Sequence, residues 1–171
     1  MSGLDNSFRD VFNGIINTNM SEITYGGMDG LMTIFSIISG AYGADFNINI
    51  IKTLSISTIF ADAISMGISS YQAEKERDSS KDASQVGYIT FVSFLILGLI
   101  PIIPFFIISE SKESKWVSFK ISYMLFALLL FLLGYVKYNN IRSGLISLFI
   151  GMIGASVSFN IARYYQSKKN L

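Results

Sequence analysis

The stretch GGMDGLMTIFSIISG (residues 26–40) has the composition of a membrane-spanning helix except at one position. Asp29 lies among Met, Leu, Ile and Phe side chains. A carboxylate at the centre of a bilayer costs about 2.5–3.5 kcal/mol even on the most lenient insertion scales. Ionisable residues inside membrane helices usually mark a pathway for ions, protons or substrates. The role of Asp29 therefore has to be read from the rest of the chain.

The overall composition predicts an integral membrane protein. Of 171 residues, 51% are hydrophobic and 15% are charged, and the mean hydropathy is +0.48. In soluble domains about a quarter of all residues are charged. The net charge of +1 gives no indication of a nucleic-acid partner. Cys and His are both absent, which excludes disulfides, thiolate or imidazole metal sites and hydrolytic triads with a His base. Carboxylates, carbonyls, hydroxyls and Met thioethers are left as metal ligands.

The hydropathy pattern predicts an all-α protein with five transmembrane helices, because about 20 apolar residues cross a bilayer. Three expected helices are strongly apolar, and they cover residues 86–109, 116–138 and 143–165. Two are less apolar and contain the acids, and they cover residues 23–44 and 49–72. The most polar connection is QAEKERDSSKDASQ (residues 72–85). We expect one membrane domain over residues 21–171, preceded by a polar or amphipathic segment over residues 1–20.

Each of the first two expected helices carries one acid on a polar stripe. Residues three and four apart share a helix face. This spacing groups Asp29 with Gly26, Thr33, Ser36 and Gly40, and it groups Asp62 with Thr58, Ser65, Met66 and Ser69. Two such stripes suit a lined pathway. Carboxylates can replace part of the hydration shell of a divalent cation, and a thioether adds a preference for transition metals over Mg²⁺ or Ca²⁺. Protons can neutralise the carboxylates once the metal leaves.

A purely structural interpretation stays open for these residues. Small-residue stripes also mark close packing between membrane helices, as Gly26-x-x-x-Gly30 illustrates. A lone Asp can be a hydrogen-bonded structural residue, and a lone Met is usually a core residue. The acids of the polar connection either raise the local cation concentration or form a solvated turn; they are Glu74, Glu76, Asp78 and Asp82.

The sequence resembles the vacuolar iron transporter family over about residues 22–165. Asp29-Gly30-Leu31, followed by Gly40, is similar to the D-G-L turn of the family's first helix. ADAISMGISSYQAEKE (residues 61–76) is similar to the A-[DG]-x-x-S-M-G-x-x-x-Y segment of its second helix, and GLIPIIPF (residues 98–105) resembles its Gly-x-x-Pro-x-x-Pro third helix.

The resemblance implies five transmembrane helices, a homodimer, and an exchanger that moves Fe²⁺, and often Mn²⁺, out of the cytosol in return for protons. It implies a vacuolar or other acidic compartment and no permanently bound cofactor. The family's D-G-L aspartate and S-M-G methionine line its pathway, so the expected metal ligands are Asp29, Asp62 and Met66. Secondary pathway candidates are Glu22, Thr33, Thr58, Ser65 and Glu74. Helix packing or bending is expected at Gly26, Gly30, Gly40, Gly67, Pro101 and Pro104.

Three departures from the family pattern affect this expectation. The position that plant-type members fill with Glu in the second helix is Thr58, and we infer that Asp62 supplies the charge instead. The long Glu-rich insertion of some members is replaced by about 14 residues. The basic residue that some members carry before the D-G-L turn is missing, because Ser21 and Glu22 stand there.

Two other classes of function compete with transport. The Asp29-Gly30 pair resembles membrane alcohol phosphotransferases, but Ala44 stands where their second acidic pair needs an Asp, which disfavours an enzyme. A structural or scaffold membrane protein that transports nothing is the main alternative.

Overall fold

The chain folds into long helices, as the sequence predicts. The structure is a computed structural model that describes residues 14, 16–77, 79–108 and 112–169, and it has no strand within these ranges. The elements are α2 (Met20–Gly43), α3 (Ile48–Glu76), α4 (Ala83–Leu99), the 3₁₀ element η1 (Ile100–Ile102), α5 (Ile103–Ile107), α6 (Lys112–Tyr138) and α7 (Ile141–Lys169). The expected N-terminal segment over residues 1–20 lies largely outside the described residues.

Four stretches are long and apolar enough to cross a membrane, namely Ile48–Glu76, Ala83–Ile107, Glu113–Tyr138 and Ile141–Lys168. The chain is therefore a multi-pass membrane protein. The sequence predicted five such helices, and α2 is the one that does not meet this criterion. The glycines of α2 and its two acids, Glu22 and Asp29, make it less apolar than a typical membrane helix.

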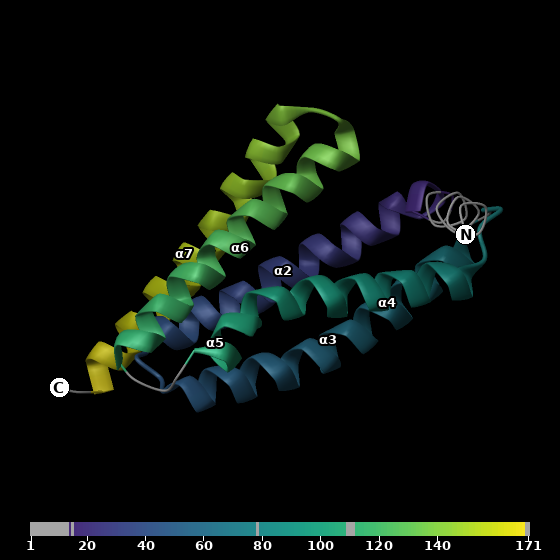
Figure 1. Cartoon of the computed structure of the whole chain (residues 1–171). Coiled ribbons are helices and arrows are strands. Elements are labelled where there is room, and N and C mark those ends of the chain that lie inside the picture. Colours follow the sequence, from purple (N-terminus) through teal and green to yellow (C-terminus); the bar gives the residue numbers. More distant parts are fainter. Residues whose placement is uncertain (1–13, 15, 78, 109–111, 170–171) are drawn as a thin grey trace, which may run out of the picture.

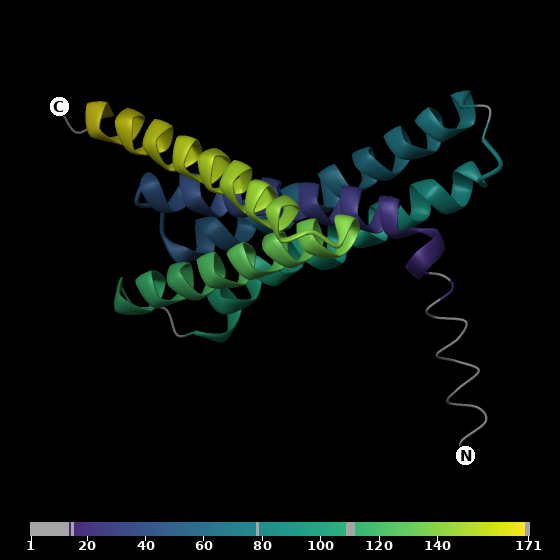
Figure 2. The ribbon, with the colours of Figure 1, turned by 90° about the horizontal axis from the view of Figure 1, so that it is seen from above.

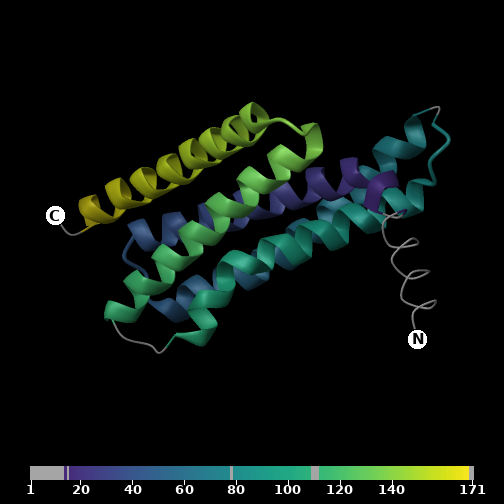
Figure 3. The ribbon, with the colours of Figure 1, turned by 45° about the horizontal axis from the view of Figure 1, so that its top comes forward.

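The central position of α2 explains how it tolerates this composition. It packs against α3, α4, α6 and α7. Figure 1 shows α2, α3 and α4 running side by side while the α6–α7 hairpin crosses them at an angle. In both turned views the turn between α6 and α7 does not extend as far as the connection between α3 and α4 (Figures 2 and 3). Fully buried Ile34, Ile38 and Phe94 belong to the core that α2 shares with α3 and α4, whereas Phe35 packs with Phe126 of α6.

Local sequence signals set where the helices begin and where the third expected helix is interrupted. The Asn47 side chain accepts a hydrogen bond from the Ile50 N–H, and the Asp82 side chain accepts one from the Ser84 N–H, each at 2.9 Å. These N-caps start α3 and α4. The α3–α4 connection thus shortens to residues 77–82. The expected helix 86–109 is interrupted after Leu99, because proline has no N–H to donate to the helix, and Pro101 lies in η1.

Glycines bring the backbones of α2, α3 and α4 unusually close together. A Cβ added at Gly26 or Gly30 would lie 2.5 Å from the carbonyl oxygen of Thr90 or Phe94, both on α4. One added at Gly67 on α3 would lie 2.9 Å from the Phe91 Cβ. Only glycine permits this approach, so α2 and α3 are held against the same helix at backbone distance.

We expect Gly30→Ala to destabilise the protein by about 1–3 kcal/mol, because the new methyl group would overlap a backbone carbonyl of α4 that has no side-chain freedom. Gly154→Ala on α7 is the matched control, since its Cβ would meet only the Ser36 Oγ at 3.8 Å. Thermal unfolding in detergent measures both. An equal or smaller loss for Gly30→Ala than for Gly154→Ala would contradict the close α2–α4 packing.

Candidate functional site

Asp29 and Asp62 lie on facing helices, α2 and α3, near enough for their charges to repel one another. Both side chains are half-buried. The two acids come from stretches of the chain that are 33 positions apart, and α2 and α3 pack directly against each other. Two neighbouring carboxylates favour binding of a cation between them, because the cation removes their mutual repulsion.

The other residues of the α2 stripe face different neighbours. Gly26 presses on α4, as described above. The Ser36 carbonyl accepts a hydrogen bond of 2.7 Å from the Ser158 Oγ, and a Cβ at Gly40 would lie 2.7 Å from that same oxygen, so this end of the stripe faces α7. Thr33 is half-buried between the two ends. The stripe therefore combines packing contacts with one charged position, Asp29.

The α3 stripe is partly exposed on the surface of the single chain. Thr58, Asp62 and Met66 are half-buried, whereas Ser65 is exposed. Met66 also packs against the core that contains Phe94, so its side chain has a packing role whatever else it does. The apolar neighbours Ile64 and Ile68 are more than half exposed. This face of α3 is left open by the other helices.

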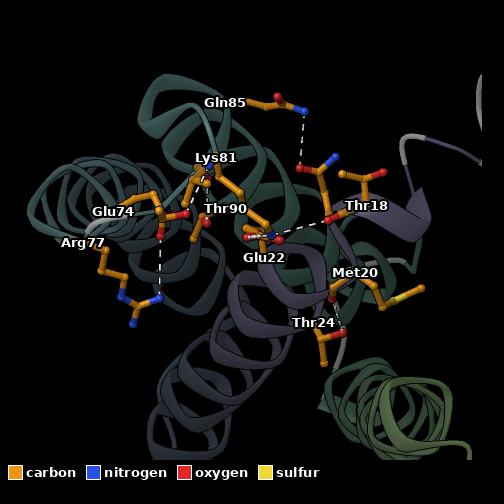
Figure 4. Close-up of polar contacts among 12 residues, drawn as sticks. Thr18, Met20, Glu22, Thr24, Glu74, Arg77, Lys81, Gln85 and Thr90 are labelled. Atoms are coloured by element: carbon orange, nitrogen blue, oxygen red, sulfur yellow. Dashed lines mark hydrogen bonds and ion pairs between the residues drawn. The ribbon is translucent and has the colours of Figure 1, made fainter.

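The structure places Glu22 and Glu74 together at a second location, which we call the vestibule. It is a cavity of about 440 Å³ at the ends of α2, α3 and α4, and its oxygen-bearing residues include Ser21, Glu22, Ser69, Ser70 and Glu74. Both carboxylates are buried, with 9% exposure for Glu22 and 7% for Glu74. Figure 4 shows these two acids among the polar residues at this end of the molecule. The other acids of the connection differ, because Glu76 is exposed and Asp82 caps α4, while Asp78 lies outside the described residues.

Basic residues also reach the vestibule, and the sequence analysis did not identify them. The Lys81 Nζ lies 2.6 Å from the Glu22 Oε1, and the Arg77 guanidinium lies 3.6 Å from a Glu74 carboxylate oxygen. Lys137 of α6 lines the same cavity. The sequence feature that could have indicated Lys81 is the short connection between α3 and α4. It keeps Lys81, which directly precedes the capping residue Asp82, near the ends of these helices. Lys81 thus places a positive charge beside Glu22, seven residues before Asp29 in the chain.

A single chain does not supply a complete set of acidic metal ligands. Among the described residues, no three His, Cys, Asp or Glu side chains cluster tightly enough to hold a metal ion. The Asp29–Asp62 pair therefore needs thioether, hydroxyl or carbonyl ligands, or ligands from a second chain, to complete a coordination shell.

The proline pair lies at the junction of α4 and α6, away from the carboxylates in sequence. Pro101 lies within η1, and Pro104 is the second residue of α5. The Pro104 carbonyl accepts hydrogen bonds from the Ile108 N–H at 3.2 Å and from the Ser118 Oγ of α6 at 3.3 Å. This bend is consequently fixed to α6 by a buried hydrogen bond.

Comparison with protein-family models finds one family. The model of the VIT family matches residues 20–86 and 72–163, which together include every described transmembrane stretch except the last residues of α7. The match also includes Asp29, Asp62 and Met66.

Individual relatives match over shorter stretches. A protein named vacuolar iron transporter from Toxoplasma gondii is 36% identical over 69 residues, and one of the same name from Plasmodium falciparum is 43% identical over 53 residues. These alignments cover 34% and 31% of this chain. They cover only 23% and 19% of the relatives' own lengths.

Proposed function

This chain belongs to the VIT family, and on that premise we propose that it transports Fe²⁺, and also Mn²⁺, across a membrane in exchange for protons. The observation that carries the proposal is the Asp29–Asp62 pair, in which two carboxylates on facing helices repel one another. Isolated charges are rarely kept inside a membrane domain without a function. The name of the relatives supports iron as the cargo.

The carboxylate pair explains how metal and protons exchange. A divalent cation between Asp29 and Asp62 cancels both negative charges. When the cation leaves, two protons restore neutrality at the same oxygens, so the metal and the protons exclude each other. The sequence contains no His to carry the protons instead. Metal moved from the cytosol into an acidic compartment, such as a vacuole, would be released there by the high proton concentration.

We further propose that α2 is a fifth transmembrane helix. Four neighbouring helices pack against it, so Gly26, Gly27 and Gly30 are buried and Asp29 is half-buried. Polar residues inside a bilayer are tolerated where they face the protein interior or a lined cavity.

A second copy of the chain would cover the open face of α3 and complete the pathway. Ser57, Ala61 and Ser65 follow one another at four-residue intervals, are exposed, and lie beside half-buried Asp62 and Met66. Small residues in this spacing allow two membrane helices to approach closely. A homodimer built on this face would bring four carboxylates around one axis.

The transport proposal is tested by metal uptake into liposomes with an acidic interior. Wild-type protein should accumulate Fe²⁺ against its gradient, and a protonophore should abolish that uphill accumulation. Asp29→Asn and Asp62→Asn should each reduce uptake by more than about tenfold, because a lost carboxylate–metal contact exceeds the 1.4 kcal/mol that corresponds to a factor of ten. If neither variant slows uptake, the pair is not the transport site; if wild-type protein moves no metal, the scaffold alternative is favoured.

Met66→Leu tests the origin of metal selectivity. Leucine keeps the volume and hydrophobicity that the core contact needs, so stability should change by less than about 1.5 kcal/mol. The thioether is lost, so Fe²⁺ uptake should fall and the preference for Fe²⁺ over Ca²⁺ should narrow. Competition assays in the same liposomes measure that ratio. Unchanged rate and unchanged ratio would leave Met66 with a packing role alone.

The dimer is tested with single cysteines, since the natural chain has none. Ser65→Cys should give a covalent dimer with a short bis-maleimide cross-linker in liposomes, because the proposed interface brings the two α3 helices together. Ser156→Cys on α7 is the matched control, as it is also an exposed serine, and it should stay largely monomeric. Preferential cross-linking through Ser156 would move the interface to α7.

A further inference from the structure

The Glu22 carboxylate in the vestibule has one bonded oxygen and one unsatisfied oxygen. Its Oε1 accepts a hydrogen bond of 2.6 Å from the Lys81 Nζ. Its Oε2 is fully buried and has no hydrogen-bond partner within the described part of the chain. An unpartnered buried carboxylate oxygen is costly, and native structures retain few of them. The vestibule therefore holds an acceptor that a further positively charged or hydrogen-bonding group would stabilise.

Lys81 is held in a way that permits its release. It comes from the 77–82 connection, and its side chain is 38% exposed while that of Glu22 is 10% exposed. Its second contact is a weak one, at 3.4 Å to the Thr18 carbonyl oxygen. A lysine ammonium is strongly hydrated and sits on a flexible stem, so it can return to water at little cost. The acid is thus fixed and buried, whereas its cation is mobile and near solvent.

The second acid of the vestibule is also only loosely neutralised. Glu74 is 7% exposed, but its Arg77 partner is 73% exposed and 3.6 Å away. Ion pairs with so exposed a partner contribute little, because water screens them. Lys137 lines the cavity as well, so its basic groups match or outnumber its two acids when no other cation is present. A cation that takes both Glu22 oxygens must displace Lys81, because the Lys81 Nζ already occupies the Oε1 position at 2.6 Å.

We propose that the vestibule is a docking site for divalent cations and that Lys81 is a tethered cation which occupies it until a metal ion displaces it. This rests on the proposed transport function, to which it adds a step before the Asp29–Asp62 pair. In the exchange, the Lys81 ammonium moves out to solvent and the metal takes both Glu22 oxygens. Ser21, Ser69 and Ser70 supply further oxygen ligands in the cavity.

The ligand chemistry predicts that this docking site discriminates poorly. All of its available donors are oxygens, which bind Mn²⁺ and Ca²⁺ as well as Fe²⁺. The site differs in this respect from the Asp29–Asp62 region, where Met66 adds a sulfur. The short 77–82 connection would thus control how much cation reaches the pathway, but not which cation passes.

The test measures Mn²⁺ binding to full-length protein that carries Asp29→Asn and Asp62→Asn, so that the vestibule is the remaining site. Free Mn²⁺ is followed by electron paramagnetic resonance. Adding Lys81→Met should tighten Mn²⁺ binding about threefold to tenfold, which is the effect expected when a partly buried ion pair no longer competes. Lys75→Met is the matched control, because it removes one positive charge at the same end of the molecule. Lys75 lies over the Tyr71 ring and does not line the vestibule. This variant should change the Mn²⁺ affinity less than twofold.

Two further results decide the inference. Glu22→Gln in the same background should abolish Mn²⁺ binding while helix content by circular dichroism stays unchanged. Equal affinities for the Lys81→Met and Lys75→Met proteins, or Mn²⁺ binding that survives Glu22→Gln, would overturn the inference. These measurements contain no transport step. Their failure beside normal wild-type uptake would therefore refute the docking site alone, whereas tighter binding beside absent uptake would refute the transport proposal alone.

Discussion

The repulsion between the Asp29 and Asp62 carboxylates is the interaction on which the rest of the site depends. Two carboxylates within reach of one another inside a largely apolar protein raise the energy of the empty state, and a cation or protons must offset that cost. A neighbouring Lys or Arg could also offset that cost. Among the described residues, however, no Lys or Arg forms an ion pair with Asp29 or Asp62. Three of the described basic residues, Lys81, Arg77 and Lys115, pair instead with Glu22, Glu74 and Asp45 at the helix ends.

The glycine contacts keep this unfavourable pair at a fixed spacing. Gly26 and Gly30 hold α2 against α4, and Gly67 holds α3 against the same helix, so the two acid-bearing helices share one support. A small separation of α2 from α3 would otherwise relieve the repulsion between the two carboxylates. Backbone contact of both helices with α4 restricts that separation, so a cation between the acids is the remaining way to relieve it.

How far the sequence predicts this arrangement differs from residue to residue. The all-α class follows from the hydropathy pattern. Helical spacing places Asp29 and Asp62 each on the polar stripe of its own helix. That the two stripes line a metal pathway stays a prediction. Whether α2 crosses the membrane cannot be predicted from the sequence, because its polar residues are tolerated there only if the four helices around it cover them. The Glu22–Lys81 contact also escapes sequence reasoning, because it joins residues 59 positions apart and depends on where the ends of α2 and α4 meet.

The proposed transport requires the site to open alternately to two sides of the membrane, and the packing limits where that motion can occur. The glycine contacts hold α2, α3 and α4 together at backbone distance, so we expect these helices to keep their arrangement and to carry Asp29 and Asp62 together. The α6–α7 hairpin also meets α2 closely at Gly43, where an added Cβ would lie 2.5 Å from the Phe159 carbonyl oxygen. Its opposite end, near the Asn139–Asn140 turn, diverges from the other helices (Figure 1). We expect a motion that keeps the carboxylate spacing intact to occur at this diverging end of the hairpin. Motion at this end of the hairpin would move Lys137 of α6, which lines the vestibule, while it left the α2–α3–α4 contacts around Asp29 and Asp62 in place.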